Sequence, residues 1–232
     1  MSAKVTAAQV DNIIPLTDSI LQITLIPEQF IDYIAGQYLQ ILFADEAFSY
    51  SIANAPLGSK KYELHIRHSP DNPFTKTLLA EIKKSGTVKL NMPLGTCHLQ
   101  NLDVQKPILF IAGGTGFAPI KAMIEQLLAD GDHRSFELFW GARSQSDLYM
   151  DDAVSHWQKH VSRFNYFSLI SNSRKENLAS LILERHPHDL NDWQIVIGGP
   201  FDMVYSTRDK LVERGIFREN IFSDAFSFES ST

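Results

Sequence analysis

Residues 107–119 constrain the fold of this chain more than any other stretch. An apolar run at residues 108–112 is followed by three glycines around one threonine at residues 113–116, and then by a helical pattern of apolar residues over residues 117–129. An uninterrupted apolar run is typical of a buried strand in a parallel sheet. Pro119 fits the first turn of a helix, where the missing N–H breaks no hydrogen bond. The sequence therefore predicts a strand, a glycine turn and a helix in immediate succession.

Such a turn exposes backbone N–H groups and the positive end of a helix dipole, which suit a phosphate or pyrophosphate group. The glycines let an anion approach the backbone closely. Their spacing differs from that of the dinucleotide fingerprint, and no Lys-Ser/Thr pair follows as in a P-loop. On this stretch alone, a nucleotide site and a purely structural turn both remain open.

Size and charge narrow the class of protein. The chain of 232 residues suits one large or two modest domains, and its formal net charge of −6 argues against nucleic acid as a partner. The N-terminus shows no signal-peptide pattern, and no apolar run approaches the roughly 20 residues that span a bilayer. We expect a cytoplasmic protein without a membrane partner.

The chain offers few metal ligands. Cys97 is the single cysteine, which excludes an internal disulfide and a four-cysteine iron–sulfur cluster. His156 and His160 have the i,i+4 spacing of ligands on a helix, but no Glu follows the first His as in a zincin motif. A solvated helix face is the better interpretation, and we predict no metal.

The first part of the chain has the pattern of a β domain. Strands are predicted at residues 4–14, 19–26, 37–43, 48–53, 61–67 and 87–92. One helix is predicted at residues 72–84, closed by Gly86. Short strands spaced in this way indicate a small antiparallel β-barrel with one helix, over residues 1–102.

The second part, residues 103–232, alternates strands with helices. The strands are predicted at residues 108–112, 136–141, 164–170, 193–198 and 220–223, and the helices at residues 117–129, 151–160, 177–185 and 200–214. This alternation predicts a parallel sheet with helices on both faces, so the fold class is two-domain, β followed by α/β.

Ligands of open parallel sheets bind at the carboxyl ends of the strands. Gly113, Gly141 and Gly198 stand at three of the four such ends, which favours a nucleotide site over a structural turn. An acid that holds the ribose is usual after the second strand of an NAD site. Arg143 lies in that place instead, so the nucleotide is expected to be held differently.

A series of short motifs follows one order along the whole chain. They are A-G-Q-Y at residues 35–38, F-S-Y-S at 48–51, E-L-H-I at 63–66, P-L-G at 93–95, G-G-T-G-F at 113–117, W-G-A-R at 140–143, G-G-P-F-D-M at 198–203 and S-D-A-F at 223–226. As a set they resemble the ferredoxin–NADP reductase superfamily, and within it the small bacterial NAD(P)H:flavin oxidoreductases, including those associated with bioluminescence. The resemblance implies a flavin-binding barrel at residues 1–102 and an NAD(P)-binding domain at residues 103–232.

For the flavin, which would be FMN, riboflavin or FAD, the resemblance implies contacts at Phe48, Ser49, Tyr50, Ser51, Ile52, His65, Ile66, Arg67, Thr115 and Phe226. Ser51 matches the motif hydroxyl near flavin N5 and is the candidate catalytic residue, with an ordinary barrel serine as the alternative. Tyr50 has cross-strand packing as its alternative. For Thr115 the alternative to a flavin contact is capping of the helix. For Phe226 the alternative is burial in the core.

For the nucleotide, the resemblance implies contacts at Gly113, Gly114, Thr115, Gly116, Phe117, Gly141, Arg143, Ser173, Arg174, Gly198, Gly199, Pro200 and Met203. Ser173 and Arg174 match a stretch that holds a 2′-phosphate, and Arg143 lies at a neighbouring strand end. Arg suits such a phosphate, so we expect NADPH to be used. A solvated charge cluster is the alternative, and use of NADH stays open.

Two positions depart from the family pattern. Phe48 replaces the arginine that contacts the flavin phosphate, and Gly198 replaces a cysteine near the nicotinamide. An arginine–phosphate contact is strong and charge-assisted, so its loss favours flavin as a diffusing substrate over a tightly held group. Whether Arg67 substitutes for the missing arginine stays open.

The predicted activity is therefore hydride transfer from nicotinamide C4 to flavin N5, with release of reduced flavin to a monooxygenase, a luciferase or ferric complexes. Two alternatives remain open. One is an electron-transfer flavoprotein that keeps its flavin and docks a ferredoxin- or flavodoxin-like acceptor. The other is a non-catalytic flavin- or nucleotide-binding module.

Overall fold

The computed structural model describes residues 2–68, 73–170 and 178–229. The chain forms two compact units. The first comprises Met1–Leu99 with Lys121–Gly131, and the second comprises Gln100–Ile120 with Asp132–Thr232. One helix, α2 (Phe117–Ala129), therefore begins in the second unit and ends in the first. The flavin and nucleotide roles assigned above to the two parts of the chain stay predictions.

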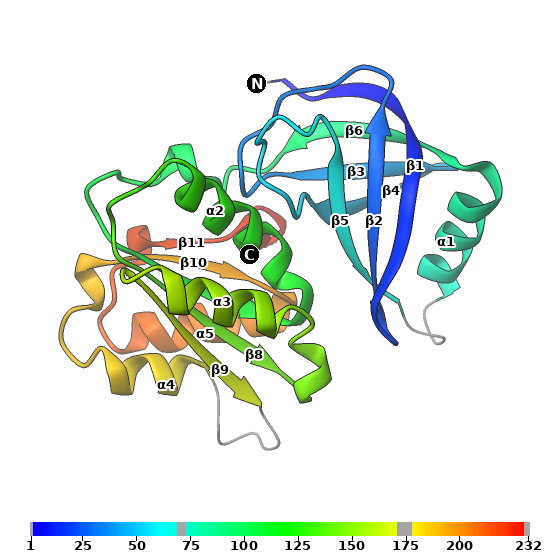
Figure 1. Cartoon of the computed structure of the whole chain (residues 1–232). Coiled ribbons are helices and arrows are strands. Elements are labelled where there is room, and N and C mark those ends of the chain that lie inside the picture. Colours follow the sequence, from blue (N-terminus) through cyan, green and yellow to red (C-terminus); the bar gives the residue numbers. More distant parts are fainter. Residues whose placement is uncertain (1, 69–72, 171–177, 230–232) are drawn as a thin grey trace. The chain divides into compact units, whose positions relative to one another are not determined.

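The first unit is an antiparallel six-stranded sheet in the order β4-β3-β6-β1-β2-β5. Its elements are β1 (Lys4–Thr17), β2 (Ile20–Pro27), β3 (Tyr38–Phe43), β4 (Glu46–Ser51), β5 (Tyr62–Arg67), α1 (Pro73–Ser85) and β6 (Thr87–Leu94), with a 3-10 turn, η1, at Leu99–Asn101 just beyond. A bridge between Ile52 and Leu64 joins the strands at the two ends of this order, so the sheet closes into a barrel. Figure 1 shows α1 beside the barrel strands.

Alternation along the strands builds the barrel core. On β6 the side chains of Val88, Leu90 and Met92 point inward, whereas Thr87 and Lys89 are exposed. This period of two is the pattern expected of a sheet with one face on the core. Tyr62 is fully buried on β5, where its hydroxyl donates to the Ile31 carbonyl and accepts from the Ile31 N–H.

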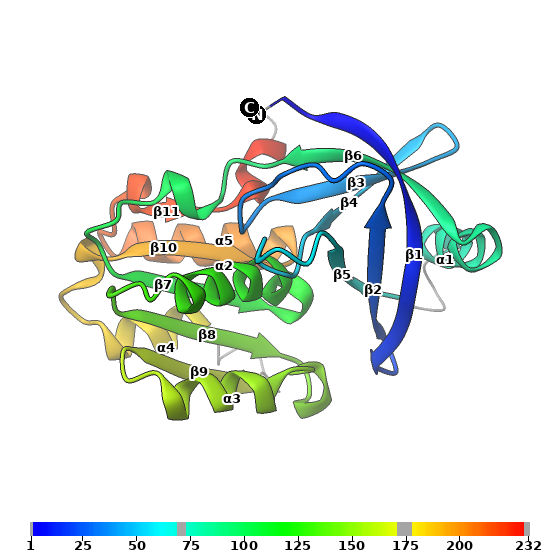
Figure 2. The same ribbon diagram turned by 45° about the horizontal axis from the view of Figure 1, so that its top comes forward.

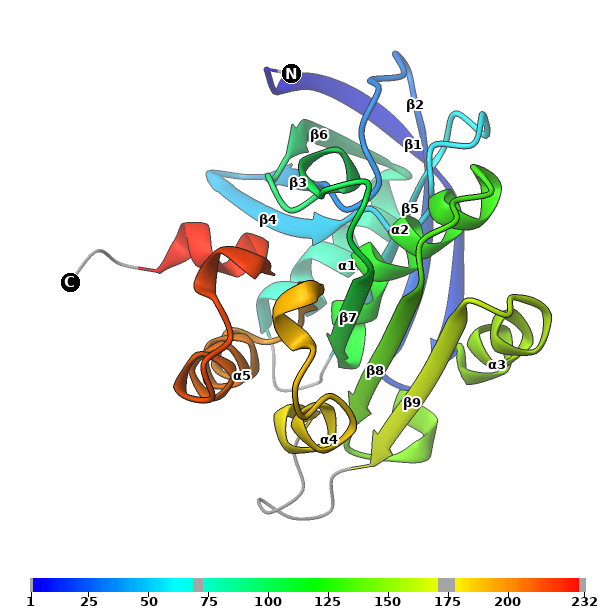
Figure 3. The same cartoon turned by 90° about the vertical axis from the view of Figure 1, so that its left-hand side faces the viewer.

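The second unit is a parallel five-stranded sheet in the order β11-β10-β7-β8-β9. Its strands are β7 (Ile108–Gly113), β8 (Phe136–Ala142), β9 (Phe164–Ile170), β10 (Gln194–Gly198) and β11 (Ile221–Phe222), and its further helices are α3 (Asp151–His160), α4 (Leu178–Arg185) and α5 (Phe201–Glu213). Figure 3 shows α3 on one face of the sheet and α4 and α5 on the other. The predicted fold class is thus confirmed.

The strand order places a switch point next to the central strand. From β7 the chain runs outward to β8 and β9, then returns to lay β10 on the other side of β7, as Figure 2 shows. Crossover connections therefore leave β7 and β10 in opposite directions. Ligands of doubly wound sheets bind in the crevice at such a point, outside the carboxyl ends of the two strands. Here those ends are Gly113 and Gly198.

Helix α5 packs on the second unit by one face. On α5 the buried residues are Val204, Thr207 and Leu211, spaced three and four residues apart. None of the helices in the described parts of the chain is long and apolar enough to cross a membrane.

Candidate functional site

The glycine turn at the end of β7 is a single 3-10 turn, η2 (Gly114–Gly116), that leads directly into α2. Gly114 has φ +53°, in the left-handed region that favours glycine. The indole N–H of Trp140, on β8, donates to the Gly114 carbonyl at 3.1 Å. The Phe117 ring stacks on Trp140 with 4.0 Å between ring centroids. The turn is thus held by the next strand of the sheet, and the Phe117 side chain is fully buried in this contact.

Across the switch point, the backbones of Gly116 and Gly198 are in direct contact. A Cβ placed on Gly116 would lie 2.2 Å from the carbonyl carbon of Gly198, and a Cβ on Gly198 would lie 2.4 Å from the Gly116 oxygen. Real side chains do not tolerate such distances. This contact leaves no room for a Cβ at Gly198, the position at which the resemblance implies a cysteine.

The methyl group of Met203, on α5, fills the space beside two further glycines. A Cβ on Gly113 would lie 2.5 Å from Met203 Cε, and a Cβ on Gly199 would lie 2.3 Å from the same atom. Gly199 also has φ +153°, which favours glycine. The glycines at the switch point allow η2, the end of β10 and Met203 of α5 to lie close to one another. This packing role is separate from any contact with an anion.

The other predicted nucleotide residues that the structure describes lie at or after strand ends, in η2 or at the start of α5. Gly141 lies near the end of β8, where a Cβ would meet Leu178 at 2.9 Å, and Arg143 follows β8 with an exposed side chain. Pro200 is exposed at the start of α5, and Thr115 is half-buried in η2. The predicted Ser173 and Arg174 lie outside the described residues.

On the barrel, β4 carries the motif that the resemblance assigns to flavin. Phe48 is opposite Ile41 of β3 and Tyr50 is opposite Leu39, and both rings are half-buried against the barrel core. Burial raises the pKa of Tyr50 to about 12, so its phenol is protonated at neutral pH. Ser49 is exposed and Ser51 half-buried. Successive side chains of a strand point to opposite faces, so Phe48 and Tyr50 face the core and the two serines face away from it.

Of the other predicted flavin residues on the barrel, three are more deeply buried than the residues of β4 and one is exposed. Ile52 is fully buried and its N–H donates to the Gln37 carbonyl at 3.1 Å. His65 and Ile66, on β5, are 5% and 1% exposed. Arg67 ends β5 with an exposed guanidinium whose Nη1 donates to the Ser19 hydroxyl at 3.3 Å.

A charged cluster that sequence reasoning missed lies beside His65. Nε2 of His65 is 2.9 Å from Oε1 of Glu63, and the Lys121 ammonium is 3.1 Å from that same oxygen. Lys121 also contacts Oε1 of Glu125 at 2.7 Å and donates to the Ala53 carbonyl at 3.0 Å. The only sequence signal was the i,i+4 spacing of Lys121 and Glu125, which ordinarily marks an exposed ion pair.

The cluster controls the charge of its members. Burial opposes ionisation of Glu63, but the hydrogen bond from His65 and the positive charge of Lys121 outweigh it and lower the pKa of Glu63 to about 2. Burial lowers the pKa of His65, and the charge of Lys121 lowers it further, against the pull of Glu63. At neutral pH Glu63 is therefore a carboxylate and His65 a neutral imidazole that can donate its Nε2–H to Glu63.

Phe226 lies in a 3-10 turn near the C-terminus, η6 (Asp224–Phe228). The Arg218 guanidinium sits 4.1 Å from the centre of its ring, and the Tyr205 ring lies 6.5 Å away. The Tyr205 hydroxyl donates to the carbonyl of the preceding residue, Ala225, at 2.9 Å. Phe226 is thus half-buried against α5 and is held by an arginine.

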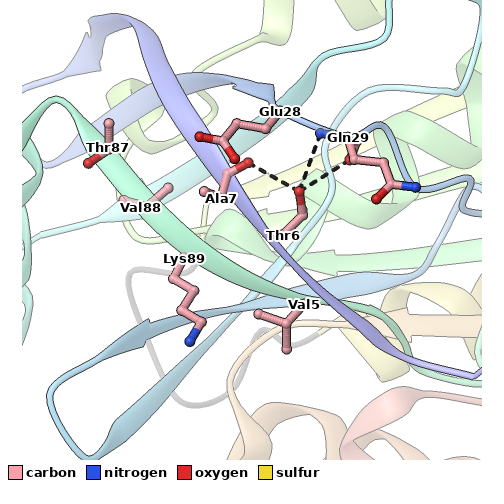
Figure 4. A pocket seen from close by; sticks show the side chains of 8 residues that line it. All are labelled: Val5, Thr6, Ala7, Glu28, Gln29, Thr87, Val88 and Lys89. Atoms are coloured by element: carbon pink, nitrogen blue, oxygen red, sulfur yellow. Dashed lines mark hydrogen bonds between the residues drawn. The ribbon is translucent and has the colours of Figure 1, made fainter.

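The barrel also carries a groove, and Figure 4 shows the residues that line it. It has a cavity volume of about 550 Å³ and is lined by Val5, Thr6, Ala7, Glu28, Gln29, Thr87, Val88 and Lys89. The Thr6 hydroxyl donates to the Gln29 carbonyl at 3.3 Å and accepts from the Gln29 N–H at 3.4 Å. None of the predicted flavin residues lines it, so the groove adds nothing to the predicted flavin site.

The antiparallel barrel and the parallel sheet with a glycine-lined switch point are the two parts of a fold that solved reductases share. Residues 110–209 match the family of oxidoreductase NAD-binding domains. Over most of its length the chain is similar to bacterial flavin reductases and, in its fold, to a solved ferredoxin–NADP+ reductase, as its sequence motifs predicted.

Some of the similar proteins are longer than this chain, and others have nearly the same length. A CDP-6-deoxy-L-threo-D-glycero-4-hexulose-3-dehydrase reductase of Yersinia pestis is 32% identical over 90% of this chain and 64% of its own length. A probable flavin reductase of Vibrio harveyi is 28% identical over 94% of this chain and 98% of its own length. The solved ferredoxin–NADP+ reductase of Plasmodium falciparum has a TM-score of 0.81 at 17% identity, over 95% of each chain. The chain spans between 59% and 64% of the length of the first curated relatives that it matches.

Proposed function

We propose that this chain is an NAD(P)H:flavin oxidoreductase that takes flavin as a diffusible substrate and releases it reduced. One observation carries the proposal: Phe48, a ring packed on the barrel core, stands where the family has a phosphate-binding arginine. The flavin would then be held by its ring system and ribityl chain, and less tightly than with that arginine. The Vibrio harveyi flavin reductase, which the chain spans almost completely, supports the same assignment.

The described residues fit a nicotinamide nucleotide and a flavin. At the switch point, Gly113, Gly114 and Gly199 offer backbone beside the first turn of α2, which suits a pyrophosphate. On the barrel, Ser51 is half-buried and its hydroxyl can donate or accept a hydrogen bond. The nicotinamide and the flavin themselves supply the hydride chemistry when bound.

In this proposal the chain orients its two ligands and supplies one polar contact. Ser51 would hydrogen-bond flavin N5, where the hydride arrives from nicotinamide C4. Transfer of a hydride needs no general base, so the proposal requires no histidine or carboxylate at the reacting atoms. Arg143 is exposed after β8 and would bind a 2′-phosphate, which favours NADPH over NADH. Reduced flavin would pass to a monooxygenase, a luciferase or ferric complexes.

A second candidate is an electron-transfer reductase that keeps its flavin and serves a partner protein. The Yersinia pestis relative, named as the reductase of a dehydrase, favours it. That protein is longer than the stretch shared with this chain, and the net charge of −6 gives no support for docking an acidic ferredoxin. The non-catalytic module has the departures at Phe48 and Gly198 as its only support.

Spectra and turnover of the purified protein separate these functions. The visible spectrum is recorded first, followed by NADPH and NADH oxidation with and without added riboflavin and FMN. A colourless protein that oxidises NAD(P)H only with added flavin, riboflavin included, supports the proposal. A yellow protein that reduces a protein acceptor without added flavin supports the second candidate. Flavin binding without oxidation of either nucleotide leaves the non-catalytic module.

A further inference from the structure

Lys121 is a buried cation whose position neither the glycine motif nor the flavin motif explains. Its side chain is 6% exposed, and its ammonium contacts Glu63, Glu125 and the Ala53 carbonyl within 3.1 Å. Burying an ammonium group without partners is costly, and these three contacts offset that cost for Lys121. Its three donors and these three acceptors match in number.

Lys121 contacts neighbours of Ile52 and His65, two residues that the resemblance assigns to the flavin. Ala53, whose carbonyl accepts from Lys121, directly follows Ile52 at the end of the flavin motif. Glu63 Oε1 lies 2.9 Å from Nε2 of His65. The backbone adds a second link, because the Ala53 N–H donates to the Glu63 carbonyl at 2.7 Å. Glu125 extends the network by accepting from the Ala55 N–H at 3.1 Å. One turn of α2 thus fixes residues 53–55 against β5.

We propose that Lys121 is a positioning residue for flavin binding, which holds residues 52–55 and the Glu63–His65 pair in the arrangement that receives the flavin. This inference rests on the proposed function, since the resemblance assigns Ile52 and His65 to the flavin. Lys121 acts through these neighbours and touches no reacting atom.

The network also acts on the pKa of His65, which burial lowers most. The charged groups that influence this pKa are Glu63 on β5 and Lys121 and Glu125 on α2. The charge of Lys121 lowers the pKa of His65, and the charge of Glu125 raises it. Removing each charge should therefore move the pKa of His65 in opposite directions. That pair of opposite shifts would show that both charges act on His65 in the folded protein, and the affinity for riboflavin then reports whether the network positions the flavin site.

The test compares Lys121→Met, Lys121→Arg and Glu125→Gln in the full chain. Riboflavin affinity is measured by fluorescence quenching, the pKa of His65 by NMR titration, and KM for NADPH by steady-state kinetics. Lys61→Met is the matched control, because Lys61 pairs with Asp11 at an exposed place on the same barrel, where such pairs contribute little.

We expect Lys121→Met to raise the Kd for riboflavin at least tenfold and to raise the pKa of His65, with KM for NADPH changed less than twofold. Lys121→Arg should restore most of the affinity, and Lys61→Met should match the wild type. Glu125→Gln should lower the pKa of His65 and weaken riboflavin binding about threefold. If Lys121→Met fails to fold, Lys121→Arg and Glu125→Gln decide on the same readouts.

Riboflavin affinity within twofold of the wild type in the folded Lys121→Met and Glu125→Gln variants, or a pKa of His65 that moves in neither, would overturn the inference. Failure of the proposed function gives a different result. In that case the wild type itself neither binds riboflavin nor oxidises NAD(P)H in its presence.

Discussion

Gly116 and Gly198 meet backbone to backbone at the switch point of the parallel sheet, so close that neither position has room for a Cβ. Gly116 is the last residue of η2, directly before α2, and Gly198 is the last residue of β10. Their contact brings together the two strand ends at which a sheet of this class binds its nucleotide. The glycines therefore build the shape of the site before any ligand is considered.

Gly198→Ala should lower the free energy of unfolding by about 1–3 kcal/mol, the usual cost of overpacking a closely packed site. Gly198→Cys, which restores the family residue, should cost at least as much because its side chain is larger. Urea denaturation measures both. Gly58→Ala serves as a comparison without crowding, because no atom lies near its Cβ position; its φ of +87° adds a backbone strain of about 1–2 kcal/mol that Gly198 does not have. A Gly198→Cys variant as stable as the wild type would contradict the crowding argument.

Phe48→Arg should give the protein a preference for FMN, which carries a phosphate, over riboflavin, which does not. One charge-assisted hydrogen bond to a phosphate contributes about 1.5–3 kcal/mol, which corresponds to roughly 10–100-fold in affinity. We expect the wild type to bind riboflavin and FMN within a few-fold of each other, and the variant to favour FMN by about tenfold or more. The variant should also be less stable, because Phe48 packs on the barrel core.

Arg67→Ala decides whether another arginine already fills that role. If the wild type prefers FMN and Arg67→Ala removes the preference while riboflavin affinity is unchanged, Arg67 is the substitute. Titration of both flavins into each variant supplies the comparison.

Ser51→Ala should slow flavin reduction about tenfold, the effect of losing one hydrogen bond of about 1.4 kcal/mol in the transition state. The measurement is the rate of NADPH oxidation at saturating riboflavin. Ser59→Ala, an exposed serine in the loop before β5, serves as the control and should keep the wild-type rate. Equal rates in all three proteins would remove Ser51 from the reaction.

Arg143→Ala should raise KM for NADPH about tenfold and leave KM for NADH within about threefold, because only NADPH carries the 2′-phosphate that an arginine fork would bind. Arg214→Ala changes an exposed arginine that follows the last residue of α5, and should alter neither value. An equal effect on both nucleotides would assign Arg143 to the shared part of the cofactor.

Local patterns predicted the fold because each element carries its own periodicity. The apolar residues of β7 and the alternation of β6 report burial directly, and the glycines marked the strand ends. The Gly116–Gly198 contact could not be predicted in the same way, since it joins two turns that only the strand order brings together.

The site was predicted less completely for the same reason. Lys121 occupies an ordinary position in an amphipathic helix pattern, and only the fold places it against Glu63 and Ala53. The Phe117 side chain is buried against Trp140, so a contact of this residue with the nucleotide, which stays a prediction, would be made by its backbone. Sequence motifs identify which backbone surrounds a ligand, but they do not report which side chains are needed to support that backbone.

His186 should make the stability of the second unit depend on pH. Its Nε2 lies 2.9 Å from Oε2 of Glu137 on β8, its Nδ1 lies 3.2 Å from Asp189, and the residue is 8% exposed. The hydrogen bond with Glu137 raises the pKa of His186 against the effect of burial, and Asp189 raises it further. The folded state therefore binds a proton more tightly than the unfolded chain, whose histidine titrates near 6.5.

The stability that this proton contributes is fully present below the unfolded pKa and is lost as the pH rises through the higher folded pKa. The difference in free energy of unfolding between wild type and His186→Gln should accordingly be larger at about pH 6 than at about pH 8.5. Urea denaturation at the two values measures it, with His188→Gln, an exposed histidine two residues away, as the control. A difference that stays constant with pH would mean that the pKa of His186 is the same in the folded and unfolded states, and a difference that is larger at about pH 8.5 would mean that the folded protein binds this proton less tightly than the unfolded chain.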